Sequence, residues 1–184
     1  MQPNNEMSGD EASAINGASP LTSVFGRRWK PDWEAKRMTR HFTFRSTQFE
    51  NKSAKPHFIN ERCFGEDLAK WLRDGLDVQF KADEVIQEDY GWGFWTQIGG
   101  DPYWVYVGVM DDSIGQDTAE WLVGVAYDPG LNIVRRLFRK PKLDDLLALC
   151  RAVDNRLQRS AGHAANIEWW QHEPQTGTPS AHPE

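Results

Sequence analysis

Adjacent acids at Glu88 and Asp89 are the residues of this 184-residue chain whose types most suggest catalysis. They lie in an extended run, where neighbouring side chains point to opposite faces, so the two carboxyl groups cannot readily share a proton as a catalytic dyad. We therefore expect a structural role for the pair. One acid should face solvent, and the other should accept a hydrogen bond from a turn or from the Trp92 indole.

A second chemical candidate is a nucleophilic pair of Cys63 and His57, which flank one polar loop. A position at the start of a helix would lower the thiol pKa and favour the reactive thiolate. However, no third residue can be assigned that would orient the histidine. The simpler interpretation is that Cys63 and Cys150 are buried free thiols packed among apolar helix residues. A disulfide between them or a reactive thiol is the alternative.

Metal and phosphate sites are not predicted. Asp111, Asp112, Asp117 and Glu120 are close in the sequence, but they lack the spacing of a calcium loop that ends in a bidentate glutamate. The five histidines form no zinc-type spacing with one another or with cysteine. The glycines of Gly91–Gly93 lie between strands and have no following helix, as a phosphate loop would require. We expect neither a metal nor another cofactor, and no catalytic residue is assigned.

Composition limits the possible partners. The net charge is −6 and the pI is about 5.4, which argues against nucleic acid and against an anionic membrane surface, since both need a basic footprint. No apolar run is long enough for a membrane span and no signal peptide is recognised, so a cytoplasmic location is expected. Nine tryptophans indicate a large core, an adhesive face, or both. A basic protein partner remains compatible with this charge.

The chain divides into one domain and two tails. Residues 1–39 predict a disordered or loosely docked tail, because their composition is polar and aperiodic. Within it, Trp29 and Trp33 could share one face of a short helix that docks on the acidic body. Residues 40–172 predict a single α+β domain. Residues 173–184, rich in Pro, Thr and Ser, predict a disordered C-terminal tail.

Two segments of the domain have helical periodicity. The first should begin at Asn60 as N-cap and fray near Gly75, and the second should open at Pro141 and stop at Gly162. Apolar residues recur at three- and four-residue steps in both. They are Phe64, Leu68, Trp71, Leu72 and Leu76 in the first helix, and Leu143, Leu146, Leu147, Cys150, Val153 and Leu157 in the second.

The remaining apolar runs alternate and predict strands. Turns are expected at Gly99–Asp101 and at Asp128–Gly130. The expected strands are His41–Arg45, Ala82–Glu88, Tyr90–Ile98, Tyr103–Met110, Ala119–Tyr127, Asn166–Trp170 and, as either strand or loop, Leu131–Phe138. The order β-α-β-β-β-(β)-α-β predicts an α+β two-layer sandwich, with a mainly antiparallel sheet of 5–6 strands and two helices on one face. This is similar to a ferredoxin-like plan with an enlarged meander.

Alternation also assigns the side chains of the meander to two faces of the sheet. The face toward the helices should hold Trp92, Phe94, Thr96, Ile98, Tyr103, Val105, Val107, Val109, Trp121, Val123 and Val125. On the other face, large aromatic residues stand beside glycines where polar residues are expected. Trp95, Trp104 and Tyr106 there form a candidate binding patch. The alternatives are cover by the N-terminal tail or the Gln48–Ile59 loop, a partner or a second copy, and a small ligand.

Charge adds an acidic rim to this patch. Between Ala82 and Val134 the chain has no Lys or Arg but ten acids, and strand ends should bring them together. Glu88, Asp89 and Asp101 therefore join the candidate binding site. Aromatic anchors inside an acidic rim are typical of an interface for a basic protein. The alternative is a solvated acidic surface that keeps the protein soluble, with the bases that follow residue 134 pairing with these acids.

Three stretches of the domain form a recognisable pattern: Asn51–Asn60, Cys63–Leu72 and Glu88–Trp92. Together they resemble a family of small uncharacterised bacterial proteins with no established activity, and the resemblance extends roughly from Phe42 to Trp170 without the N-terminal tail. It implies a compact bacterial domain and supplies no catalytic residues. A small acidic α+β domain with a tryptophan-rich sheet is also similar to the immunity proteins of bacterial toxin systems, at the level of the fold alone.

The leading functional hypothesis is a non-enzymatic protein-binding module, of immunity type or self-associating, that binds a basic protein or a second copy of itself. Its contact residues would be the six named above on the aromatic face and its rim. The alternative is a small-molecule-binding protein or hydrolase, with a pocket between the Lys52–Cys63 loop and the sheet.

Overall fold

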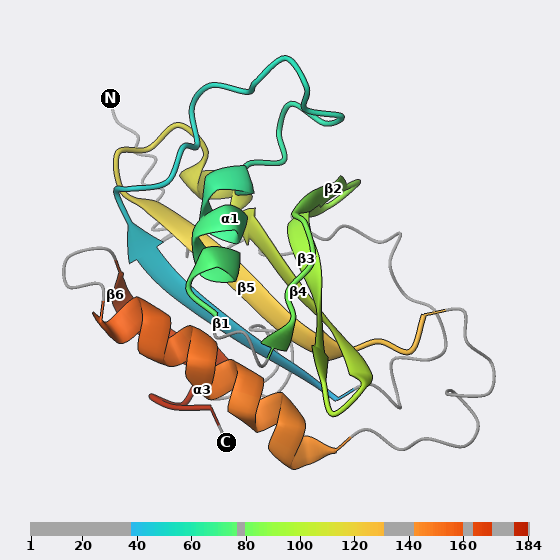
Figure 1. Ribbon diagram of the computed structural model, residues 1–184. Helices are drawn as coiled ribbons and strands as arrows, with labels where there is room; N and C mark the ends of the chain where they lie inside the picture. Colours follow the sequence, from blue (N-terminus) through green and yellow to red (C-terminus); the bar gives the residue numbers. More distant parts are fainter. Residues whose placement is uncertain (1–37, 77–79, 131–141, 160–163, 171–178, 184) are drawn as a thin grey trace, which may run out of the picture.

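In the part of the chain that the structure describes, one strand and one helix precede a run of four strands, and a further helix and a last strand follow (Figure 1). The computed structural model describes residues 38–76, 80–130, 142–159, 164–170 and 179–183. The elements are β1 (Thr39–Ser46), α1 (Glu66–Asp74), β2 (Ile86–Glu88), β3 (Gly91–Ile98), β4 (Asp101–Val109), the 3-10 turn η3 (Asp111–Ser113), β5 (Ala119–Tyr127), α3 (Leu143–Arg159) and β6 (Ala165–Trp170).

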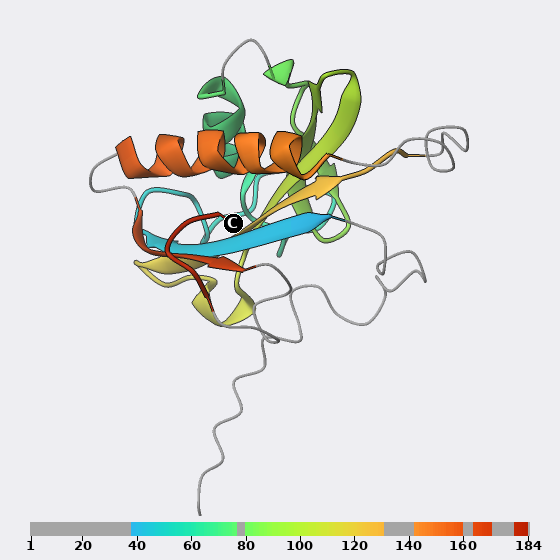
Figure 2. The same ribbon diagram turned by 90° about the horizontal axis from the view of Figure 1, so that it is seen from below.

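The six strands form one antiparallel sheet in the order β2-β3-β4-β5-β1-β6. The strands β2 to β5 are a meander, and β1 lies between β5 and β6. Both helices of the described residues cover the same face of the sheet (Figures 1 and 2), and neither of them lies on the other face, which is called the face without helices below. The predicted two-layer α+β fold is therefore confirmed.

The predicted division of the meander's side chains between the two faces of the sheet is also confirmed. Phe94 lies opposite Val105, and Val105 lies opposite Val125. The alternate residues on this side of β3, β4 and β5 are buried with the apolar stripes of α1 and α3 in one core. Burial of an apolar side chain of this size stabilises the fold by about 1.5–3 kcal/mol. The alternation of apolar residues that predicted the two faces of the sheet therefore also builds the core.

Helix α1 begins later than predicted. The sequence suggested Asn60 as its N-cap, but the helix starts at Glu66, directly after Gly65. The φ of Gly65 is +129°, and a Cβ there would come within 2.9 Å of Val107 Cγ2. Close packing on β4 thus fixes the chain in a conformation that only glycine adopts easily, and a helix cannot run through it. Asn60 instead accepts hydrogen bonds from the backbone amides of Arg62 and Cys63 in a turn.

Helix α3 buries most of its predicted stripe. Leu146, Leu147, Cys150, Val153 and Leu157 are buried, whereas Leu143 at the first position is 44% exposed. The predicted start at Pro141, the predicted stop at Gly162 and the uncertain segment Leu131–Phe138 lie outside the described residues.

The strand expected over Ala82–Glu88 is shorter than predicted, since only Ile86–Glu88 is a strand. The chain before it still follows β3, because the Asp83 amide donates to the Trp95 carbonyl at 2.8 Å. A two-residue turn at Asp89 and Tyr90 leads into β3.

The predicted tails, residues 1–39 and 173–184, lie largely outside the described residues. Within the described part of the chain, neither helix has the length and hydropathy needed to cross a bilayer.

Candidate functional site

The aromatic residues predicted to form a patch do lie together on the face without helices. Trp95 of β3 is directly opposite Trp104 of β4, and their ring centroids are 4.9 Å apart. The Trp104 indole donates to the Tyr90 hydroxyl at 3.1 Å. Tyr90 also meets the Tyr106 ring edge-on, with 6.2 Å between centroids. The sequence therefore placed these rings on the right face and beside one another.

Two of these rings are not exposed, and the expectation of an open aromatic face is wrong for them. Trp104 is 3% exposed and Tyr106 is 6% exposed. Each ring lies close over a glycine of a neighbouring strand: a Cβ at Gly93 would come 2.6 Å from Trp104 Cζ2, and one at Gly124 would overlap the Tyr106 ring. The glycines thus make room for the two rings, which pack against the sheet. Both rings therefore contribute to packing and offer little surface to a partner. Trp95 alone is half-buried.

The three predicted acidic residues also differ in exposure. Glu88 and Asp89 are exposed at the end of β2, as a rim requires. Asp101, the first residue of β4, is buried opposite Ile98 and does not belong to the rim. Its strand position at the closing pair of the hairpin carries it inward, which the sequence did not indicate.

The hydrogen bond expected between Trp92 and one of the paired acids is not made. The Trp92 indole donates instead to the Cys63 carbonyl at 2.7 Å. Asp89 contributes its own backbone carbonyl, which accepts from Asn60 Nδ2 and from Cys63 Sγ, each at 3.4 Å. The turn after β2 is therefore attached to the long loop before α1 through one backbone carbonyl, which accepts from two side chains of the loop.

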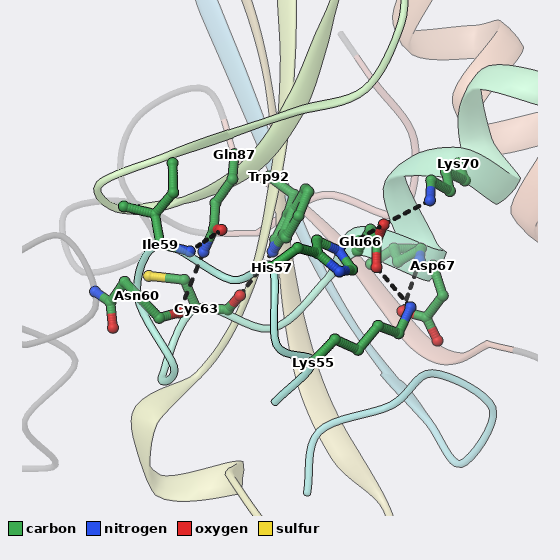
Figure 3. A network of polar contacts seen from close by, with 11 residues as sticks. Lys55, His57, Ile59, Asn60, Cys63, Glu66, Asp67, Lys70, Gln87 and Trp92 are labelled. Carbon is green, nitrogen blue, oxygen red and sulfur yellow. Dashed lines mark hydrogen bonds and ion pairs between the residues drawn. The ribbon is translucent and has the colours of Figure 1, made fainter. Parts of the chain in front are cut away.

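A second attachment joins this loop to β2 through one side chain. Gln87 Oε1 accepts from the Ile59 amide at 2.7 Å, and Gln87 Nε2 donates to the Asn60 carbonyl at 3.1 Å (Figure 3). The carboxamide thus satisfies a backbone donor and a backbone acceptor of the loop at once. It fixes the loop beside β2.

Glu66 anchors the other side of the same loop. Its buried carboxylate accepts from Lys55 Nζ and from Lys70 Nζ, each at 2.5 Å, and its Oε1 lies 3.2 Å from His57 Nε2 (Figure 3). Burial by itself would raise the pKa of Glu66, but the hydrogen bonds and charges of the two lysines outweigh it and lower the pKa to about 2. The i,i+4 spacing of Glu66 and Lys70 was visible in the sequence. The contact with Lys55 was not.

This arrangement argues against the Cys63–His57 nucleophile. Figure 3 shows His57 directed at Glu66, while Cys63 points toward the turn after β2. Burial, helped by Asp111 and Asp89, raises the pKa of the Cys63 thiol. The expected lowering by a helix N-terminus fails because α1 begins only at Glu66.

Both cysteines are free, so the alternative of a disulfide is wrong. Cys150 is the buried thiol that the sequence predicted, and burial raises its pKa to about 12. Among the described residues, no three His, Cys, Asp or Glu side chains are grouped so that they could hold a metal ion.

Two large apolar side chains that are exposed in the structure indicate a different candidate surface, at the β2 edge of the sheet. Ile59 in the loop is 76% exposed and Ile86 in β2 is 41% exposed, and both belong to the Gln87 contact region. Exposed acids lie beside them. We define the β2 edge surface as Ile59, Glu84, Ile86, Glu88, Asp89 and Trp95. It contains three of the six predicted contact residues. The two isoleucines were missed, because alternation alone does not reveal the exposure of a short edge strand.

The two edges of the sheet are built differently. At β6, the Trp169 amide and carbonyl exchange hydrogen bonds with Ser180, both at 2.8 Å. At β2, no strand within the described ranges pairs with the outer side. Other acids of the meander are already paired elsewhere: Asp117 with Lys52 at 2.5 Å and Glu120 with Arg45 at 3.3 Å.

Comparison of the chain with family models, with curated proteins and with solved structures yields no match in any of the three.

Proposed function

We propose that this chain is a non-enzymatic protein-binding module that docks a basic protein on the β2 edge surface. The observation that carries the proposal is the coincidence of two exposed isoleucines, Ile59 and Ile86, with exposed acids at one edge of the sheet. Exposed apolar residues gathered in one place favour an interface, whereas scattered ones need no explanation.

The charge of the surface indicates the class of partner. Asp83, Glu84, Glu88 and Asp89 are all exposed. Lys81 precedes them in the chain, and no Lys or Arg follows until Arg135. The acids are therefore in excess. Such a field speeds encounter with a basic protein and disfavours acidic ones, while the apolar residues supply most of the affinity. The half-buried Trp95 extends the surface onto the aromatic face.

The resemblance to small bacterial proteins and the similarity to immunity proteins belong to the same proposal. An immunity-type module would act in the cytoplasm by binding a basic toxin and blocking it, without chemistry of its own. The hydrolase alternative has less support, because the groups that it needs, His57 and Cys63, are engaged with different partners and the thiol pKa is raised.

A capture experiment with matched variants tests the proposal. The full-length chain is immobilised and exposed to a lysate of its own source cells, and retained proteins are identified by mass spectrometry. The double variant Ile59→Asp with Ile86→Asp should lose a basic protein that the unchanged chain retains. Leu143→Asp is the matched control, because Leu143 is about as exposed as Ile86 but lies at the start of α3.

Unfolding in urea is measured for all three chains, and the substitutions should change the unfolding free energy by less than about 1 kcal/mol because the sites are exposed. The proposal would be contradicted if the unchanged chain retained no basic protein, or if the double variant retained the same protein as the control.

A further inference from the structure

The outer side of β2 has the form of a vacant strand position. A strand at the edge of a sheet presents backbone amides and carbonyls that can pair with another chain. Within the described segments, β6 makes such pairs with Ser180 and β2 makes none on its outer side. Resting on the proposed function, we propose that the partner binds by adding an extended basic segment to β2 as a further strand.

The two isoleucines lie on opposite sides of this position. Ile86 is directly opposite Gly93, so its side chain is on the face without helices, beside Trp104, whose ring covers that glycine. Gln87 is opposite Trp92, and its side chain holds Ile59 on the helix side of the strand. Because side chains of a strand alternate, an added strand would meet Ile86 with one set of side chains and Ile59 with the other.

The acids decide which extended segment fits. Glu84 and Glu88 flank Ile86 at alternate positions of the chain. A second copy that paired antiparallel about Ile86 would bring Glu84 of one chain opposite Glu88 of the other, and directly opposed like charges destabilise a strand pair. A segment with Lys or Arg opposite Glu84 and Glu88 would be attracted to these acids, whereas the acids of a second copy would be repelled. The occupant is therefore a basic strand of another protein, and self-association is disfavoured.

The loop that carries Ile59 is attached to β2 and to α1 in the chain by itself. Gln87 holds it at one end, and the Glu66 carboxylate holds it through Lys55 at the other (Figure 3). A contact residue that is already in place costs less entropy on binding than a mobile one. Long loops without regular structure are usually functional when they are ordered, which agrees with this role.

Short capped peptides can separate the contribution of backbone pairing from that of charge attraction. The probe alternates Lys or Arg with Val. In one matched peptide the amides of the odd residues are N-methylated, and in the other those of the even residues, which blocks backbone pairing along a single edge without changing charge. Binding to the full-length chain is measured by fluorescence anisotropy. We expect one methylated peptide to bind at least about tenfold more weakly than the probe, and the other to keep most of the affinity, because a strand pairs through alternate amides.

Equal binding of all three peptides would overturn strand addition, and so would failure of the unmethylated probe to bind. The first result would leave the proposed function intact if the capture experiment succeeded, since it would mean that charge and apolar contact suffice. A chain that sediments as a dimer, and as a monomer once Ile86→Asp is introduced, would assign the strand position to a second copy and would also overturn the inference.

Discussion

The two edges of the sheet differ in how far the described chain itself covers them. At β6, Trp169 is buried, its indole donates to the buried Asp154 of α3 at 3.0 Å, and its backbone pairs with Ser180. At β2, the strand is three residues long and carries exposed Ile86 and Glu88. The edge near α3 is thus closed by the chain itself, whereas no described segment pairs with the outer side of the edge near the long loop.

This difference bears on aggregation as well as on function. An open edge is a hazard, and natural proteins limit it with short strands and charged side chains. β2 has both features, since it is short and the acids Glu84, Glu88 and Asp89 surround it. In the proposed strand addition, the acids that deter a second copy also favour a basic strand, so one feature both limits aggregation and selects the partner.

The largest predicted effect is at the closed edge. Trp169→Ala would remove a fully buried indole whose ring centroid lies 4.4 Å from that of the tilted Phe42 ring, and it would leave Asp154 without its donor. We expect a loss of about 3–5 kcal/mol in the free energy of unfolding, measured in urea. Ile86→Ala at the open edge should cost less than about 1 kcal/mol. Similar losses for the two variants would show that the edges are not built differently.

A smaller effect is expected at the loop anchor, and it should depend on pH. The pKa of Glu66 in the folded chain is about 2, below its ordinary value of 4.5. The folded state therefore releases this proton more readily than the unfolded state, and the stabilisation is complete above pH 4.5 and lost as pH falls toward 2. Glu66→Gln should lower the unfolding free energy at neutral pH by about 2 kcal/mol. This is less than the full pKa difference would give, because both lysine partners are half exposed.

The difference between Glu66→Gln and the unchanged chain should shrink to near zero as pH approaches 2, as measured by urea unfolding at a series of pH values. Glu61→Gln, at an exposed site of the same loop, is the control and should show no such trend. A difference that stayed constant with pH would mean that packing of Glu66, and not its charge, anchors the loop.

Much of the fold was predictable because it follows from local periodicity. The strand Ala119–Tyr127 has the predicted bounds, and the face of each β3 and β4 residue follows from alternation, as Phe94 and Val105 illustrate. The register was predictable for the same reason, since a shift by one residue would expose the entire apolar set.

The site was less predictable because it depends on contacts between distant residues. Nothing near Gly65 in the sequence indicates that this residue packs closely on Val107. Because of this packing, α1 begins later in the chain than predicted. Alternation placed Trp104 and Tyr106 on the correct face, but it could not reveal that both rings pack over glycines. The exposure of Ile59 likewise depends on a loop that Gln87 and Glu66 hold in place.

Residue-resolved amide hydrogen exchange of the full-length chain, alone and with the basic peptide, tests whether the outer side of β2 is unpaired and accepts a further strand. In a strand that pairs on one side only, alternate amides point away from the partner strand and exchange rapidly. We expect a protected amide at Trp169 in the free chain, a rapidly exchanging amide within Ile86–Glu88, and slower exchange of that β2 amide by at least about tenfold when the peptide is added. Protection of every β2 amide in the free chain, or no change on adding the peptide, would contradict this expectation.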